Sequence, residues 1–205
     1  MAGKRDERNG VIEVSSQPGS TSGPETLHVL SVCTHNRTRS VIAGALLSRY
    51  LTRLRVPSTV ATSGTYSAGQ PAIDRAVRLL AAQGMDVELH RSSVLDDETV
   101  NGSDVIVTAE RDHVVSIAGR WRGAFARTFT LPELVQRGES VGPRRGAPIG
   151  EWLQLVGKGR PTAFDYIDAA DIAEVADPTG QSPAAWDAAY REIDDLARRL
   201  AAVLA

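Results

Sequence analysis

The chain has 205 residues, of which 42% are hydrophobic and 23% charged, and its formal net charge is −2 at pH 7. This length suits one domain, or one domain with appendages, and is enough to bury a sizeable core. The nearly balanced charge excludes a broad electrostatic attraction to nucleic acid or anionic lipid. We therefore expect neither as a partner, and we expect any anion site to be local.

The chain contains a single cysteine, Cys33. One cysteine permits no internal disulfide bond and no thiolate zinc site, and His28, His90 and His113 are not paired at metal-ligand spacing. We therefore expect no metal and no other cofactor. Because the first 25 residues lack the apolar core of a signal peptide and the apolar stretch 41–47 is too short to span a bilayer, we expect a cytoplasmic protein without a membrane segment.

The first part of the chain differs in composition from the remainder. Residues 1–25 are rich in Ser, Gly, Pro and charge and have almost no apolar periodicity, which predicts a disordered leader. The folded domain is then expected to comprise residues 26–205.

Strand-like and helix-like segments alternate along the domain. Short β-rich runs predict strands, and apolar residues at helical spacing predict helices after each strand. Such alternation implies an α/β fold with a parallel sheet and helices on its faces. The predicted strands are 27–32, 59–62 and 104–108, and the helices that follow them are 41–51, 71–83 and 111–117.

The second half of the domain is less regular. A fourth strand is predicted at 125–131 and a long amphipathic helix at 183–205. The connection at 136–170 looks irregular, apart from a short helix at 152–156. So long a connection is uncommon in a compact domain and is more often functional or disordered than neutral.

The strongest chemical signal is the polar stretch VCTHNRTRS at residues 32–40. It lies between the first predicted strand and the helix after it, so its backbone N–H groups would converge on one anion at the positive end of the helix dipole. A thiol at this point is held more easily as a thiolate, which is the nucleophilic form. Arg39 can bind two oxygens of the same tetrahedral anion while Cys33 attacks its central atom.

In its motifs and their order the chain resembles the low-molecular-weight protein tyrosine phosphatases. Cys33, five residues, Arg39 and Ser40 follow the first strand, and Asp177-Pro178 precedes the last helix. The resemblance extends over roughly 27–130 and 172–205 and also includes the segments 63–71, 84–92 and 103–107. It implies a three-layer α/β fold with a four-stranded parallel sheet and helices on both faces. The phosphatase domain at 26–205 would then carry an insertion at about 131–171.

The resemblance also implies a two-step reaction on a phosphorylated protein or a small phosphomonoester, most specifically phosphotyrosine. Cys33 would attack phosphorus to form a phosphocysteine, Asp177 would act first as general acid and then as general base, and Arg39 would hold the phosphate oxygens. His90 would support the loop from behind, and Arg37 would either bind the phosphate or lie at the solvated rim. The expected substrate-binding residues are Thr34, His35, Asn36, Arg37, Thr38 and Ser40.

The chain departs from the family pattern at three positions. His35 stands where glycine is usual, which implies an unusual backbone conformation or a reshaped loop, and Thr38 replaces a second cysteine. Thr179 stands where the family has aromatic residues beside the acid, so a wall for a phosphotyrosine ring is missing there. The insertion could supply that wall as a lid, through Trp152, Phe164 or Tyr166.

Two other functions fit the same residues. A single-cysteine arsenate reductase would use Cys33 together with an external thiol. A non-catalytic phosphate-binding regulatory module would need neither the nucleophile nor the acid, which Cys33 and Asp177 provide here.

Overall fold

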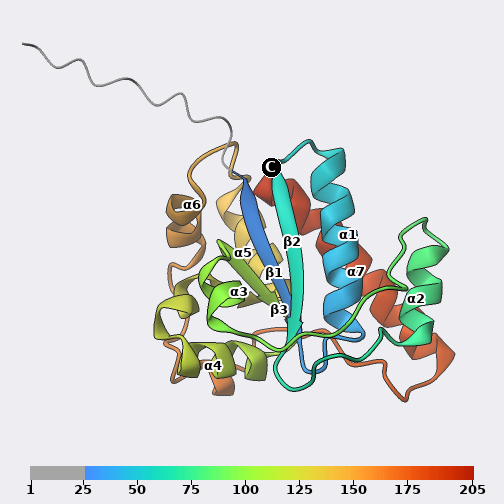
Figure 1. Cartoon of the computed structure of the whole chain (residues 1–205). Helices are drawn as coiled ribbons and strands as arrows, with labels where there is room; N and C mark the ends of the chain where they lie inside the picture. The colour runs from blue at the N-terminus through green and yellow to red at the C-terminus, as the bar shows by residue number, and fades with distance from the viewer. Residues whose placement is uncertain (1–25) are drawn as a thin grey trace, which may run out of the picture.

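The computed structural model describes residues 26–205, and its four strands form one parallel sheet (Figure 1). The sheet order is β2-β1-β3-β4, so β1 pairs with β2 on one side and with β3 on the other. The predicted α/β fold with a four-stranded parallel sheet is therefore confirmed. The strands are β1 (Leu27–Cys33), β2 (Ser58–Gly64), β3 (Val105–Thr108) and β4 (Thr128–Thr130).

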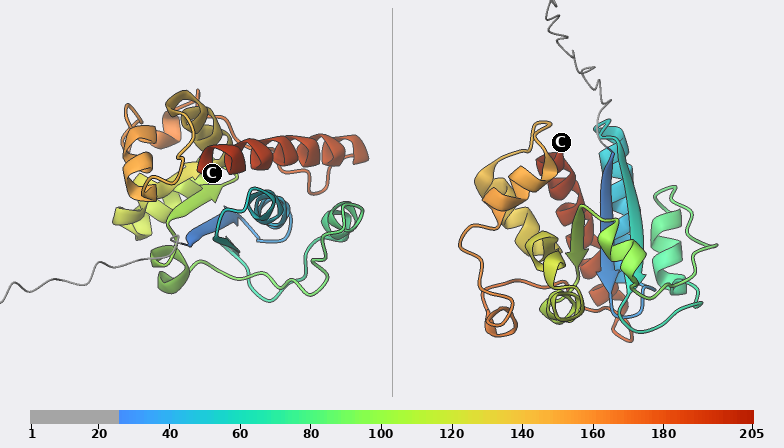
Figure 2. Two further views of the ribbon diagram at one scale, coloured as in Figure 1. Left: turned by 90° about the horizontal axis from the view of Figure 1, so that it is seen from above. Right: turned by 60° about the vertical axis from the view of Figure 1, so that its left-hand side comes forward.

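Helices cover both faces of this sheet, as the three-layer prediction requires. Alternate residues of a strand point to opposite faces. On β1, Leu27 and Val29 belong to one buried cluster, and Leu30 and Val32 belong to another. The first cluster includes side chains of α1 (Arg39–Arg53), α5 (Leu131–Val141) and α7 (Pro183–Leu204). The second includes side chains of α3 (Asp97–Asn101), α4 (Arg111–Arg120) and the 3₁₀ helix η1 (Arg122–Arg127). The arrangement of the helices around the sheet can be followed in Figure 2.

Two predicted element boundaries are wrong. The helix predicted from Pro71 is α2 (Asp74–Ala81), because Pro71 instead forms an isolated bridge with Arg91. The fourth strand is β4, shorter than the predicted 125–131, because the chain forms η1 up to Arg127.

The connection predicted to be irregular at 136–170 contains regular structure. It holds most of α5, then α6 (Ile149–Val156) and the short 3₁₀ helix η2 (Tyr166–Asp168). The helix predicted at 152–156 is confirmed as part of α6. Glycines at 138 and 142 suggested a loop, but Gly138 lies inside α5, where an added Cβ would come within 3.0 Å of Trp152 and Val203 side-chain atoms. Its glycine allows α5 to pack closely on α6 and α7.

The prediction of a leader at 1–25 lies outside the described residues. Within residues 26–205, no helix combines the length and the apolar character that crossing a membrane requires.

Candidate active site

The candidate site is a loop at the carboxyl edge of the sheet, which lies at the bottom of Figure 1. Residues 34–38 connect β1 to α1, and Thr38 is the N-cap of α1 without a side-chain cap. In the described part of the chain, no backbone N–H of residues 34–38 donates to a backbone carbonyl. These donors and the first turn of α1 are therefore available to an anion.

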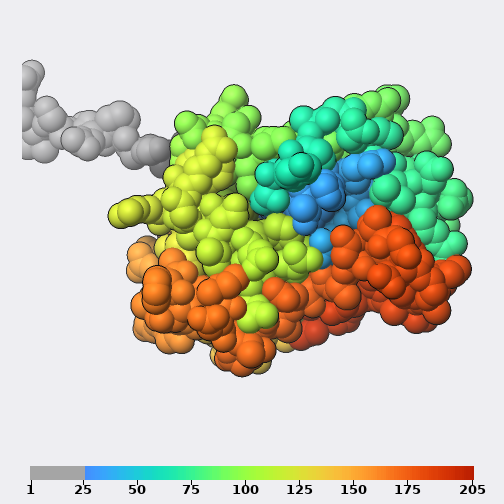
Figure 3. All heavy atoms as spheres, turned by 90° about the horizontal axis from the view of Figure 1, so that it is seen from below, coloured from blue at the N-terminus to red at the C-terminus, as the bar shows by residue number. Residues whose placement is uncertain are grey.

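The loop is recessed in the molecular surface. Seen from below, it lies in blue between the teal segment after β2 and the orange-red segment before α7 (Figure 3). A pocket of about 60 Å³ opens there. It is lined by Cys33, Thr34, His35, Arg37, Thr38, Arg39, Ile73, Asp177 and Thr179.

Cys33 lies at the base of this pocket and is only 3% exposed. Its Sγ atom is 3.1 Å from Ser40 Oγ. Because the Asn36 side-chain amide donates to the same Ser40 oxygen over 3.0 Å, the Ser40 hydroxyl hydrogen is free to donate to sulfur.

Asn36 fixes the shape of the loop. It has a positive φ of 51°, a conformation that asparagine tolerates well. Its side-chain oxygen accepts from the N–H of Ser93 over 3.0 Å, and its backbone carbonyl lies 2.7 Å from His90 Nε2. His35 is not among the positive-φ residues of the described chain, so the loop accommodates it without left-handed backbone.

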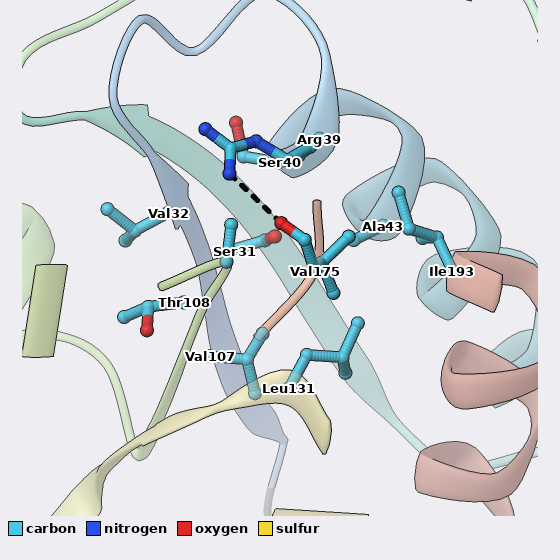
Figure 4. Close-up of a pocket in the computed structure, with 11 residues that line it drawn as sticks. Ser31, Val32, Arg39, Ser40, Ala43, Val107, Thr108, Leu131, Val175 and Ile193 are labelled. Carbon is cyan, nitrogen blue, oxygen red and sulfur yellow. Dashed lines mark hydrogen bonds between the residues drawn. The ribbon is translucent and has the colours of Figure 1, made fainter. Parts of the chain in front are cut away.

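Arg39 is buried, with 3% of its surface exposed, and three groups hold its guanidinium. Nη1 donates to a Glu110 carboxylate oxygen and to the carbonyl of Val175 over 3.0 Å, and Nη2 donates to Asp177 Oδ2 over 3.1 Å. Figure 4 shows the bond to Val175 across a small cavity behind the loop. Among the described residues, Nε–H and the second Nη2–H have no acceptor, so they can bind phosphate oxygens.

Asp177 faces the loop from the segment that precedes α7. Its Oδ1 accepts from the N–H of Thr179 over 3.0 Å, and the Thr179 hydroxyl lies 3.3 Å from that of Thr38. The carboxylate side chain remains 41% exposed, so it is accessible to a ligand in the pocket. Cys33, Arg39 and Asp177 therefore meet at one pocket although 144 positions separate the first from the last.

His113 is a part of the site that the sequence did not reveal. Its ring is buried, its Nδ1 accepts from the N–H of Glu110 over 3.1 Å, and its Nε2 lies 3.0 Å from Thr34 Oγ1. The proton is therefore on Nε2, which donates to Thr34. Burial lowers the pKa of His113, which keeps the ring neutral.

Tyr66 is the second residue that the sequence reasoning missed. It is 77% exposed on the loop after β2, and its ring packs edge-on against His35 with 5.5 Å between centroids. Its backbone N–H donates to the carbonyl of Thr34 over 3.0 Å. The sequence signal was its place directly after Ser63-Gly64-Thr65, which the family resemblance already included.

Not every predicted substrate-binding side chain reaches the pocket. Thr34, His35, Arg37 and Thr38 line it, and Arg37 also donates through Nε to the carbonyl of Pro71 over 2.8 Å. The side chains of Asn36 and Ser40 do not line it, because they are buried behind the loop and bind one another. Their side chains support the loop next to His90, and contact of these two residues with substrate stays a prediction.

The aromatic residues of the insertion do not form a lid. Trp152 is 3% exposed and Tyr166 is fully buried, so both belong to the interior, and Phe164 is 89% exposed. None of the three lines the pocket. Within residues 26–205, no group of three or more His, Cys, Asp or Glu side chains is placed to hold a metal ion.

Comparisons with known proteins agree with this geometry. The family model of the low molecular weight phosphotyrosine protein phosphatases matches residues 28–139. A relative from Ralstonia solanacearum, named "Probable low molecular weight protein-tyrosine-phosphatase EpsP", is 34% identical over 108 residues, which are 53% of this chain and 72% of the relative.

Solved structures with the same fold include two from bacilli. The solution structure of a low molecular weight protein tyrosine phosphatase from Bacillus subtilis is 25% identical, has a TM-score of 0.62 and matches 85% of this chain and 95% of its own. The YwlE arginine phosphatase from Geobacillus stearothermophilus is 26% identical, also with a TM-score of 0.62, over 85% of this chain and 90% of its own. The chain belongs to the low molecular weight phosphotyrosine protein phosphatase family.

Proposed function

We propose that this protein is a phosphomonoester hydrolase that removes phosphate from phosphotyrosine through a phosphocysteine intermediate. The observation that carries the proposal is the single pocket lined by Cys33, Arg39 and Asp177. A nucleophile, an anion clamp and a proton donor on one pocket are what phosphoryl transfer from an ester requires.

In the first step, the Cys33 thiolate attacks phosphorus, an S–P bond forms and the P–O bond to the leaving group breaks. The free donors of Arg39 and the N–H groups of residues 34–38 bind the equatorial oxygens as charge develops. Asp177 gives its proton to the leaving oxygen. Arg39 donates to Asp177 in this structure, and a bound phosphate would compete for the same guanidinium.

In the second step, water attacks the phosphocysteine and Asp177 accepts a proton from that water. The S–P bond breaks, phosphate leaves and the thiolate of Cys33 returns, stabilised by the hydroxyl of Ser40. No oxidant or reductant is consumed. A thiolate nucleophile without a second cysteine needs a reducing compartment, which supports our assignment of the protein to the cytoplasm.

Tyr66 supports an aryl phosphate as the substrate class. Its exposed ring stands next to His35, which lines the pocket, and so offers an aromatic surface to a phosphotyrosine ring. This surface comes from the segment after β2. That segment and the residues that follow Asp177 lie on opposite sides of the loop of residues 34–38 (Figure 3). We therefore propose that the substrate is a phosphorylated protein.

The decisive experiment is a hydrolysis assay on p-nitrophenyl phosphate with mass spectrometry of Cys33. We expect a phosphorylated Cys33 in the wild type, and no turnover but retained phosphate binding in Cys33→Ser. Asp177→Ala is expected to lower kcat by about 10²- to 10⁴-fold, the usual range for a positioned proton donor. Wild-type turnover in the serine variant would contradict the mechanism.

Assays on other substrates separate the proposal from its rivals. Arsenate-dependent consumption of an external thiol that is unaffected by Asp177→Asn would indicate arsenate reduction, because only an ester needs its leaving group protonated. Faster hydrolysis of phosphoarginine than of phosphotyrosine peptides would place the protein with the arginine phosphatase it resembles in fold. Phosphate binding without turnover of any of these substrates would indicate a regulatory binding module.

A further inference from the structure

We propose that Arg111 is a positioning residue for the general acid. It fixes the end of the insertion to α4 and thereby holds Asp177 over the loop of residues 34–38, the phosphate loop. The inference rests on the proposed function, because it assumes that Asp177 protonates the leaving group. It concerns the contacts of Arg111 with residues 167–174, of which Ile167 and Ala169 lie in the stretch that the family resemblance does not cover.

Arg111 makes four hydrogen bonds to the segment before Asp177. Its backbone N–H and its Nε both donate to Glu174 Oε1, over 2.7 and 3.2 Å. Its Nη1 donates to the carbonyls of Ile167 and Ala169, over 3.2 and 2.9 Å. One side chain at the first position of α4 therefore binds η2, the turn after it and the approach to the acid.

This segment is held at three consecutive residues. The carbonyl of Ala173 accepts from the Thr130 hydroxyl over 2.9 Å, Glu174 binds Arg111, and the N–H of Val175 donates to the carbonyl of Ala109 over 2.9 Å. Val175 in turn offers its carbonyl to Arg39. Asp177 lies two residues beyond this anchored stretch, so its position depends on it.

The insertion supplies the other end of the support. Tyr166, in η2, is fully buried against Val114 of α4 and Ile172, and its hydroxyl donates to Glu133 of α5. Arg160 binds both oxygens of the same Glu133 and lies 3.8 Å from the centroid of the Phe129 ring. A buried, fully paired cluster of this kind is rigid. Arg111 connects it to residues 173–177, the acid segment, and so restricts the movement of that segment.

Glu174 is 35% exposed and Arg111 is 23% exposed, so their ion pair by itself adds little stability. Its effect is expected in geometry. General acid catalysis depends on the distance between the carboxyl and the leaving oxygen, and a misplacement of about 1 Å can cost on the order of 10²-fold in rate. The loss therefore depends on how much the leaving group needs the proton.

The test compares kcat/KM for phenyl phosphate, which has a poor leaving group, with that for 2,4-dinitrophenyl phosphate, which leaves without a proton. Arg111→Met keeps the apolar stem but removes the fork of donors. We expect it to lower kcat/KM for phenyl phosphate by about 10- to 100-fold and that for 2,4-dinitrophenyl phosphate by less than about 3-fold. Arg111→Lys, which can still pair with Glu174, should recover part of the loss.

Controls separate positioning from general damage. Arg144→Met removes a guanidinium that likewise binds two backbone carbonyls, those of Ala147 and Leu204. These contacts lie outside the acid segment, so the variant should change kcat/KM for neither substrate. Glu174→Gln changes an exposed side chain with little risk to folding and should repeat the Arg111→Met pattern in weaker form. The inference would be overturned if Arg111→Met lowered kcat/KM equally for both substrates. It would also be overturned if neither Arg111→Met nor Glu174→Gln lowered kcat/KM for phenyl phosphate.

Failure of the proposed function has a different signature. If Asp177→Asn does not discriminate between the two leaving groups, the acid assignment itself is wrong and the inference falls with it. If Asp177→Asn discriminates and Arg111→Met does not, the proposed function stands and only the positioning role of Arg111 is rejected.

Discussion

At the scale of single residues, the site is a set of polar side chains whose states are fixed by their partners. The amide of Asn36 donates to the oxygen of Ser40, which leaves the hydroxyl hydrogen of Ser40 free to point at Cys33. Similarly, His113 can donate to Thr34 only because its other nitrogen accepts from the backbone of Glu110. Cys33 and Thr34 are thus each supported by a second residue that does not line the pocket.

His113 predicts a dependence of stability on pH. Burial lowers its pKa in the folded protein, and the positive charge of Arg39 acts in the same direction, against the carboxylates of Glu110, Asp112 and Glu174. Below about pH 6.5 the unfolded chain therefore binds a proton that the folded chain refuses, so stability falls as pH falls. We expect the melting temperature to drop between about pH 7.5 and about pH 5.5, and His113→Gln to reduce that drop.

The variant retains a side-chain donor toward Thr34 but cannot titrate. His28→Gln is the matched control, because it makes the same replacement at an exposed histidine on β1. The assignment fails if wild type and His113→Gln lose the same number of degrees between the two pH values.

At the scale of elements, the end of β2 determines the shape of the phosphate loop. Gly64 pairs with Cys33 in the sheet, and an added Cβ there would lie 2.8 Å from the carbonyl oxygen of Thr34 and 3.0 Å from the nitrogen of Asn36. Both neighbours are backbone atoms of the loop, so they cannot rotate away. Glycine at this position lets β2 approach the loop from behind.

Gly64→Ala is therefore predicted to deform the loop. We expect kcat/KM for p-nitrophenyl phosphate to fall by about 10²-fold, with weaker phosphate binding and a loss of about 1–3 kcal/mol in the free energy of unfolding. Gly119→Ala, in α4 where the added Cβ meets nothing within 4 Å, should keep full activity. Equal activity of both variants would show that the loop tolerates the extra methyl group.

At the scale of the whole molecule, the segment 131–171, which the sequence analysis predicts to be an insertion, contributes to the core. Trp152 and Tyr166 are both buried, and Trp152 Nε1 donates to the carbonyl of Gly142 over 2.9 Å. Arg160 ties the segment to β4 through the carbonyl of Thr128 over 2.7 Å. This segment is thus packed into the interior and bonded to β4, directly before the residues that lead to Asp177.

Deleting residues 140–165 is predicted to destroy cooperative folding. Removing a buried tryptophan alone costs about 3–5 kcal/mol, and the deletion also leaves the carboxylate of Glu133 without Arg160. Circular dichroism and thermal melts measure the result. Phe164→Ala, which truncates an 89% exposed side chain, should change neither the melting temperature nor KM. A deletion variant that folds with an unchanged melting temperature and an altered KM would restore the lid.

The sequence by itself determined the strand-loop-helix unit around Cys33, because its signals are local: an apolar strand, polar loop residues and an amphipathic helix within 27 residues, 27–53. The alternation of later segments likewise determined the parallel sheet. Helix α5 was missed because its glycine, Gly138, serves packing against α6 and α7, a reason that only the neighbours reveal.

Only the tertiary structure decided which distant residues complete the site. Glu110, His113 and Arg111 look like ordinary charged helix residues in the sequence, and they acquire their partners because β3 delivers the start of α4 beside the phosphate loop. The same holds for Tyr66 and for the buried position of Trp152. Hydrogen bonds and packing between segments depend on distances in space, and spacing along the chain does not contain them.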